Sequence, residues 1–245
     1  MKQLFAINPE LDRAGLAAAF ARDGRVQVRD VLTRETATEL REVLMRGTPW
    51  GLAGQAGEGG GGPQQINAPA LRGGDGQARA QALAQATHAA SSRGEYAFRY
   101  AHYPIVQAYL EGWAKDGPHD ILLEHLNADP FLGLARDVTG IRELVKADAQ
   151  ATLFAPQHYL GRHIDSHVAE GWRVAYVLNL TVDDWHPDWG GYLQFLDEDG
   201  DVVAGYRPRF NSLNLLRVPQ SHSVSYVAPF APVGRFAITG WLRDR

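Results

Sequence analysis

The sequence predicts an α+β protein with a mainly β core, in which a helical first half supports an antiparallel sandwich or barrel. Three observations lead to this expectation. Apolar residues recur at helical spacing through much of residues 1–144, and short alternating runs rich in Val, Leu, Tyr, Phe and Thr follow from about residue 145. Gly, Pro, Asp and Asn turns separate these runs. About eight short strands at such spacing are typical of an antiparallel sandwich or barrel.

The first half is expected to be mainly helical. Pro9 precedes a helical repeat of apolar residues, and Thr33 is a suitable N-cap for a second helix. The expected elements are a helix after Pro9, a short strand at 24–31, a helix after Thr33, and helices at 76–91, 97–115 and 128–137.

A glycine-rich segment follows the second helix, with seven glycines from Gly51 to Gly62. No Gly-Lys-Ser/Thr sequence follows it, which argues against a phosphate-binding P-loop. We expect a mobile surface loop, and the alternative is a lid over an active site.

The second half is expected to hold the strands of the core. Asp197 to Gly200 is a hairpin turn between two of them, because Gly200 can take a positive φ. The expected strands are 149–155, 158–163, 173–181, 191–196, 201–205, 212–217, 222–227 and 234–243.

The chain of 245 residues suffices for one large domain or two small ones. We divide it into a helical support region, residues 1–144, and a core, residues 145–245. Both form one structural unit in this prediction, because the β core alone would expose an apolar face.

Composition excludes several classes of function. The net charge is −4 and no basic block exceeds two residues, so nucleic acid is not an expected partner. The chain has no cysteine, which leaves His, Asp and Glu as metal ligands. No apolar run approaches a membrane span or the core of a signal peptide. We therefore expect a cytoplasmic protein.

His163 and Asp165 are the first candidate metal ligands. Side chains two residues apart on a strand point to the same face. With His222 they would complete a set of two histidines and one carboxylate, which suits Fe(II) with open positions for a co-substrate and O₂. Arg235 would supply a fixed cation for an anionic co-substrate. His158 and His167 are weaker alternatives as ligands.

Two segments make a resemblance specific. Residues 154–165 read FAPQHYLGRHID, and residues 218–244 hold His222, Arg235 and an aromatic-rich end. Gly190 to Phe195 reads GGYLQF. These segments resemble the Fe(II)- and 2-oxoglutarate-dependent dioxygenases of the prolyl-hydroxylase type, including bacterial proline hydroxylase-type members. The resemblance covers about 145–245 well and the first half less well.

The resemblance implies a double-stranded β-helix (jelly roll) with the N-terminal helices packed on one face. It implies iron bound by His163, Asp165 and His222, and 2-oxoglutarate whose far carboxylate meets Arg235. Succinate and CO₂ would be the co-products of hydroxylation of an unactivated C–H bond, with ascorbate as a possible reductant. Halogenating relatives replace the carboxylate with a small residue, so Asp165 favours hydroxylation.

Departures from the family pattern leave the second ligand of 2-oxoglutarate open. Some relatives have a tyrosine where Phe154 stands, and oxygen-sensing members place a tyrosine at the position of Asn179. Asn179, Tyr159 and Thr239 are therefore candidates for co-substrate binding. The weaker candidates for the pocket are Gln150 and Thr152, with Arg173, Trp185 and Trp189 for the substrate.

Three functions follow from these observations. The first is a dioxygenase acting on a prolyl or other residue of a protein or peptide. The second is an oxygenase of a free amino acid or small metabolite. The third is a metal-binding sensor without catalysis, against which Arg235 argues. The sequence predicts no oligomeric state.

Overall fold

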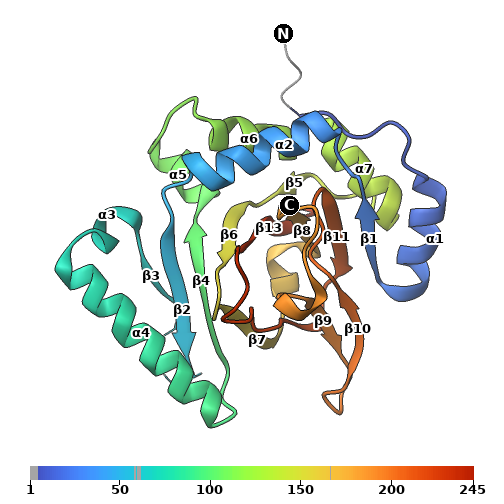
Figure 1. Cartoon of the computed structure of the whole chain (residues 1–245). Coiled ribbons are helices and arrows are strands. Elements are labelled where there is room, and N and C mark those ends of the chain that lie inside the picture. Colours follow the sequence, from blue (N-terminus) through green and yellow to red (C-terminus); the bar gives the residue numbers. More distant parts are fainter. Residues whose placement is uncertain (1–4, 58, 60–61, 166) are drawn as a thin grey trace.

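The computed structural model describes residues 5–57, 59, 62–165 and 167–245, without the side chains of 167 and 168. Figure 1 shows a strongly curved, mostly antiparallel sheet that forms a nearly closed barrel with helices around it. This confirms the expected jelly-roll core with supporting helices. None of the helices in the described part of the chain has the length and apolarity that crossing a membrane requires.

The helices come from the first 144 residues, apart from two 3₁₀ turns, η2 (His167–Glu170) and η3 (Pro187–Trp189). Thr33 caps the second helix by accepting a hydrogen bond from the Thr36 N–H, as predicted. The helical segments are α1 (Arg13–Asp23), α2 (Arg34–Glu42), η1 (Val43–Gly47), α3 (Ala68–Leu71), α4 (Gly74–Ser92), α5 (Ile105–Glu111), α6 (Pro118–Leu126) and α7 (Asp129–Thr139).

All eight strands expected in the second half are present. They are β6 (Gln150–Phe154), β7 (Tyr159–Ile164), β8 (Trp172–Asn179), β9 (Leu193–Leu196), β10 (Val202–Tyr206), β11 (Ser212–Arg217), β12 (Ser221–Val224) and β13 (Arg235–Arg243). A two-residue strand, β5 (Lys146–Ala147), pairs with β13. Gly200 adopts a φ of 93° in the turn that joins β9 to its antiparallel partner β10.

The first half also contributes strands, of which only β1 (Arg25–Arg29) was expected. The others are β2 (Gly51–Ala56), β3 (Gln64–Ile66) and β4 (Ala97–Tyr103). The sheet order is β1-β11-β8-β13-β6-β4-β7-β12-β9-β10, with β2 paired to β3 and β4. The N-terminal half is therefore built into the barrel, because β4 lies between two strands of the C-terminal half.

Two predictions for the first half were wrong. The helix expected at 97–115 is β4 followed by the shorter helix α5, because Pro104 separates a run of aromatic residues from the helical segment. The loop expected at 51–62 begins with β2, in which Gly51 packs so closely that a Cβ there would lie 2.5 Å from the Ile66 carbonyl oxygen. Residues 58, 60 and 61 of that segment lie outside the described residues, so the lid stays a prediction.

The alternation of β13 separates core from cavity. Ile238 and Leu242 face the largest apolar cluster, which also holds Phe20 of α1 and Phe131 of α7. Arg235, Thr239 and Trp241, which occupy odd-numbered positions of the strand, face the interior of the barrel. Burial of a large apolar side chain stabilises a fold by roughly 1.5–3 kcal/mol, so the helices are held on the outer face of this sheet by side chains of alternate residues.

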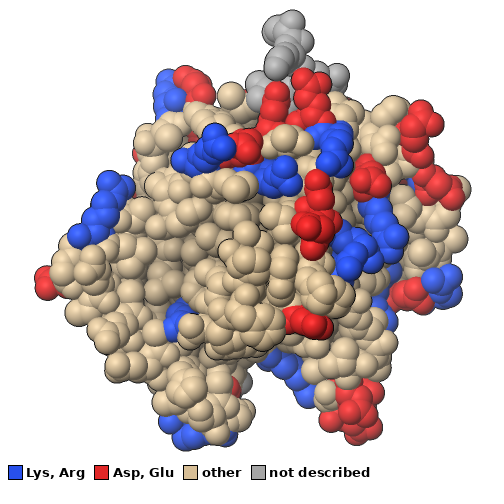
Figure 2. Space-filling view, viewed as in Figure 1, with Lys and Arg blue, Asp and Glu red and all other residues tan. Residues whose placement is uncertain are grey.

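Charged side chains of both signs lie mainly around the rim of the face seen in Figure 2, and few lie near its centre. This mixed distribution fits the small net charge of −4 and creates no large field of one sign on that face.

Candidate active site

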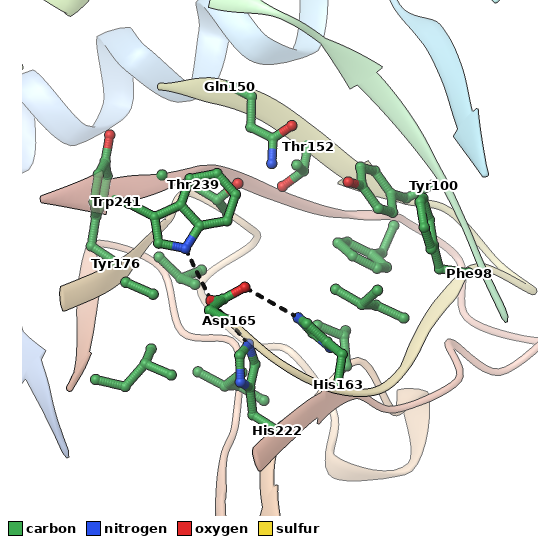
Figure 3. Close-up of a pocket in the computed structure, with 18 of the residues that line it drawn as sticks. Phe98, Tyr100, Gln150, Thr152, His163, Asp165, Tyr176, His222, Thr239 and Trp241 are labelled. Carbon is green, nitrogen blue, oxygen red and sulfur yellow. Dashed lines mark hydrogen bonds and ion pairs between the residues drawn. The ribbon is translucent and has the colours of Figure 1, made fainter. Parts of the chain in front are cut away.

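Three side chains of the ligand type converge inside the barrel. His163 of β7 and His222 of β12 are direct partners in an antiparallel ladder, so their side chains share one face. Asp165 follows β7 two residues after His163 and turns to the same face. Its Oδ1 lies 3.8 Å from Nε2 of His163, and its Oδ2 lies 3.8 Å from Nε2 of His222 (Figure 3). The ligand atoms of all three lie within 4.8 Å of one another.

Both imidazole rings are fixed by backbone carbonyl groups. Nδ1 of His163 lies 3.0 Å from the Gly161 oxygen, and Nδ1 of His222 lies 2.8 Å from the Gln220 oxygen. A carbonyl oxygen only accepts, so each Nδ1 donates its hydrogen and each Nε2 presents a lone pair to the site. Burial, followed by the neighbouring His163, lowers the pKa of His222 to about 4. The ring is therefore neutral and able to bind a metal at neutral pH.

Trp241 fixes the carboxylate. Its indole Nε1–H donates to Oδ2 of Asp165 at 3.0 Å, as the dashed line in Figure 3 shows. The indole also stacks on Trp172, with ring centroids 3.8 Å apart. Hydrogen bonds of this kind orient metal ligands in proteins. This contact was not predicted from the sequence, although Trp241 lies two residues after Thr239 and so shares its face of the strand.

Arg235 lies in the same cavity and is almost completely buried, with 1% of its surface exposed. Its Nε and one terminal nitrogen donate to Oδ1 of Asn179 at 3.3 and 3.2 Å. The other terminal nitrogen, Nη1, is buried and has no hydrogen-bond partner in the described part of the chain. The guanidinium carbon lies 5.4 Å from the centre of the Phe154 ring.

This arginine fits an anionic ligand. Burial lowers its pKa to about 10, so it remains a cation at neutral pH. A buried cation without a carboxylate partner is costly, because the charge has lost its hydration. An anion that enters the cavity would replace that hydration and satisfy Nη1. The donor set of two imidazoles and one carboxylate likewise fits Fe(II).

The cavity has a volume of about 510 Å³, and seven aromatic residues contribute to its wall. Tyr100 stacks on Phe154 with ring centroids 5.0 Å apart, and burial raises the pKa of Tyr100 to about 12, so its hydroxyl stays protonated. Gln150, Thr152 and Thr239 provide polar groups in the wall, as considered from the sequence. The aromatic lining consists of Tyr96, Phe98, Tyr100, Phe154, Trp172, Tyr176 and Trp241.

Asn179 and Tyr159, two candidates for co-substrate binding, lie outside this lining. Asn179 contacts Arg235 without lining the cavity itself. Its amide nitrogen donates to the hydroxyl and carbonyl oxygens of Ser212 at 3.3 and 3.4 Å. Tyr159 donates its hydroxyl hydrogen to the Thr87 carbonyl at 3.0 Å and lines an adjoining groove.

The candidates for substrate binding also lie elsewhere. Arg173 pairs with Asp244 at 2.6 Å. Trp185 is buried, and its indole donates to the Gly190 carbonyl at 3.0 Å while Trp189 packs edge-on against it. His158, the weaker ligand candidate, has its Nδ1 against backbone atoms of Leu153 and Ala155.

Comparisons with known proteins agree with this site. Residues 149–243 match the family described as the 2OG-Fe(II) oxygenase superfamily, and this segment contains all three ligand candidates and Arg235. A search of curated proteins found no significant match.

Three solved structures share the fold over nearly the whole chain. A Pseudomonas putida prolyl-4-hydroxylase is 16% identical with a TM-score of 0.57, and 98% of each chain is covered. A Trichoplax adhaerens prolyl hydroxylase, in complex with a hypoxia inducible factor peptide fragment, is 16% identical with a TM-score of 0.59 and coverage of 95% and 89%. The 2-oxoglutarate (alpha ketoglutarate)-dependent epimerase SnoN from nogalamycin biosynthesis is 15% identical with a TM-score of 0.55 and coverage of 95% and 80%.

At these identities the structures establish the fold, and the family match identifies the domain that holds the site. Residues 149–243 therefore resemble the 2OG-Fe(II) oxygenase superfamily, and the chain as a whole has a prolyl-hydroxylase-like fold.

Proposed function

We propose that this oxygenase hydroxylates an unactivated C–H bond of a prolyl or other residue in a protein or peptide. The observation that carries the proposal is the buried Arg235, whose Nη1 lacks a partner among the described residues, in the same cavity as His163, Asp165 and His222. A protein that only stored or sensed a metal would have no need of a buried cation in its metal cavity.

His163, Asp165 and His222 would hold Fe(II), and Trp241 would hold Asp165 in place. When bound, iron supplies the activation of O₂, coupled to the conversion of 2-oxoglutarate to succinate and CO₂, that no side chain provides. The histidines reach the metal as neutral ligands through Nε2. Ascorbate as a reductant stays a prediction.

Arg235 would bind the far carboxylate of 2-oxoglutarate through its planar fork. Asn179 would act as a positioning residue, since its Oδ1 already accepts two hydrogen bonds from the guanidinium. Thr239 and Tyr100 line the same cavity with hydroxyl groups, and Tyr100 lies over Phe154, which has none. The aromatic walls would exclude water from the reacting atoms.

A groove beside the catalytic cavity favours a polypeptide as the substrate. It has a volume of about 670 Å³, runs between α4 and strands β7 and β12, and is lined by Tyr159, Tyr226 and Arg99. It shares Leu160, Arg162 and Val224 with the catalytic cavity, so a polypeptide in the groove could place one residue at the metal. The fold shared with two prolyl hydroxylases, one of them in complex with a peptide, also supports this substrate class.

The second candidate is oxidation of a free amino acid or small metabolite. The likeness to an epimerase from nogalamycin biosynthesis favours this possibility, because the same fold there carries a different reaction. The catalytic cavity of about 510 Å³ is large enough for a small ligand without the groove.

The test supplies the enzyme with Fe(II), 2-oxoglutarate and O₂, together with a host peptide digest in one arm and a metabolite extract in the other. We expect succinate release, with peptides gaining the mass of one oxygen atom. Asp165→Ala should abolish both signals, whereas Asp188→Ala, an exposed carboxylate outside the cavity, should retain them. Oxygen found only in metabolites would favour the second candidate. Succinate release that is equal for the wild type and Asp165→Ala would contradict both.

A further inference from the structure

A cluster of three arginines lies away from the catalytic site. Arg29 ends β1, and Arg207 and Arg209 belong to the short link between β10 and β11. They line a cavity of about 450 Å³ together with Gln27, Tyr192 and Tyr206. The cavity shares no lining residue with the catalytic cavity. Tyr192 directly precedes Leu193, which lines the catalytic cavity, so the two side chains point to opposite faces of the chain.

The local sequence explains why the two arginines of the link lie together. Arg207, Pro208 and Arg209 are alternately half-buried, buried and half-buried. In an extended segment residues two apart point to the same side, so Pro208 packs inward while both arginines face the cavity. Gln27 of β1 donates to the Arg207 carbonyl at 3.1 Å and ties the link to the edge strand.

The cluster has no compensating charge in the described part of the chain. No carboxylate there forms an ion pair with any of the three guanidinium groups, and the Nε atoms of Arg207 and Arg209 are buried without a hydrogen-bond partner. Burial, followed by the charges of Arg29 and Arg207, lowers the pKa of Arg209, and Tyr192 opposes this shift. Asp23, which lies near Tyr206, is already paired with Arg22 at 2.8 Å.

Three like charges in one cavity repel one another and cost free energy unless an anion binds. We propose that the cavity lined by Arg29, Arg207 and Arg209 binds the phosphoryl group of a small phosphate-bearing ligand. A dianion compensates more of the positive charge than a carboxylate does. Guanidinium forks also bind the oxygens of a phosphoryl group in pairs. Tyr192 and Tyr206 line the same cavity, so an organic group on the ligand would contact aromatic side chains.

Calorimetric titration of the protein loaded with Fe(II) and 2-oxoglutarate without O₂ tests this site, because the ligands of the catalytic cavity are then in place. The probes are inorganic phosphate, glycerol phosphate, phenyl phosphate, acetate and chloride at equal ionic strength. We expect the phosphates to bind and acetate and chloride to bind at least about tenfold more weakly. Tighter binding of phenyl phosphate than of inorganic phosphate would identify an organic phosphomonoester, and equal binding would identify free phosphate.

Substitutions of the three arginines test whether phosphate binds in this cavity. Arg209→Gln and Arg207→Gln should each weaken phosphate binding by roughly tenfold to a hundredfold, since each removes a charged donor. Arg142→Gln, an exposed arginine elsewhere, should bind as the wild type does. Arg29→Gln at the exposed end of β1 serves the same purpose if a variant in the link fails to fold. The proposal is wrong if Arg209→Gln and Arg29→Gln bind phosphate as tightly as the wild type, if acetate equals phosphate, or if Arg235→Lys alone abolishes binding.

Discussion

Arg235 carries a buried charge, and its Nη1 has no hydrogen-bond partner among the residues that the structure describes. We predict that Arg235→Lys raises the KM for 2-oxoglutarate by roughly tenfold to a hundredfold, because lysine lacks the planar fork and cannot keep both bonds to Asn179. Fe(II) affinity should change little, since Arg235 is not among the metal ligands. Steady-state kinetics with varied 2-oxoglutarate, beside calorimetric titration of the metal, checks both parts. Arg142→Lys is the matched surface control.

Trp241 provides a second prediction for a single residue. Trp241→Phe keeps an aromatic ring beside Trp172 but removes the 3.0 Å hydrogen bond to Asp165. We expect Fe(II) affinity or kcat to fall by roughly tenfold to a hundredfold, as for other partners of metal ligands. Trp113→Phe removes an indole bond to the exposed Glu111 and should leave both values unchanged. Equal metal affinity and kcat in Trp241→Phe and the wild type would show that Asp165 needs no such support.

Strand alternation was enough to predict that His163 and Asp165 share a face, and it could also have placed Trp241. Pairing across strands could not be predicted, so the direct opposition of His163 and His222 became visible only in the fold. Tyr100 was missed because its segment was interpreted as helix. Asn179 and Tyr159 were candidates for co-substrate binding. In the structure Asn179 contacts Arg235 and Ser212, and Tyr159 contacts Thr87.

Among the elements, the strands β2 and β4 differ most from what the sequence predicted. Glycine density predicted a loop at β2, but glycine is also required where two backbones approach closely. Aromatic residues in β4 have high strand propensity, which the expected helix at 97–115 did not take into account. The consequence is that β4 provides Phe98 and Tyr100 to the wall of the catalytic cavity.

The close packing of β2 gives a prediction for stability. Gly51→Ala should lower the free energy of unfolding by about 1–3 kcal/mol, because its Cβ would lie 2.5 Å from the Ile66 carbonyl oxygen. Gly133→Ala in α7, where a Cβ would meet nothing within 4 Å, should instead stabilise the protein by up to about 1 kcal/mol. Urea unfolding of both variants measures the difference. Equal stability of the two would contradict the close approach of β2 and β3.

For the whole molecule, buried histidines predict how stability depends on pH. Burial lowers the pKa of His102 from an ordinary value of 6.5 to about 4. Between these values the unfolded chain binds more protons than the folded one, so stability is complete above about pH 6.5 and is lost as the pH falls towards 4. At pH 5 the loss from such a histidine is on the order of 2 kcal/mol.

Urea unfolding at pH 7 and pH 5 checks this dependence. His102→Gln cannot gain the proton and should show a smaller loss of stability between the two pH values than the wild type. His88→Gln, which changes an exposed histidine of α4, should keep the wild-type dependence. An unchanged dependence in His102→Gln would show that His102 is already solvated in the folded protein.

The pairing of β1 with β11 has a consequence for how the chain folds during synthesis. Arg25–Arg29 is synthesised long before its partner Ser212–Arg217, because most of the barrel lies between them in the sequence. Until then the nascent chain carries an unpaired edge with the apolar side chains of Val26 and Val28. Closing contacts over so many residues is slow, because the entropy of a large loop is lost before the contacts stabilise it. We therefore expect the barrel to close only once β11 has been synthesised and has left the ribosome, with chaperones protecting the edge of β1 in the meantime.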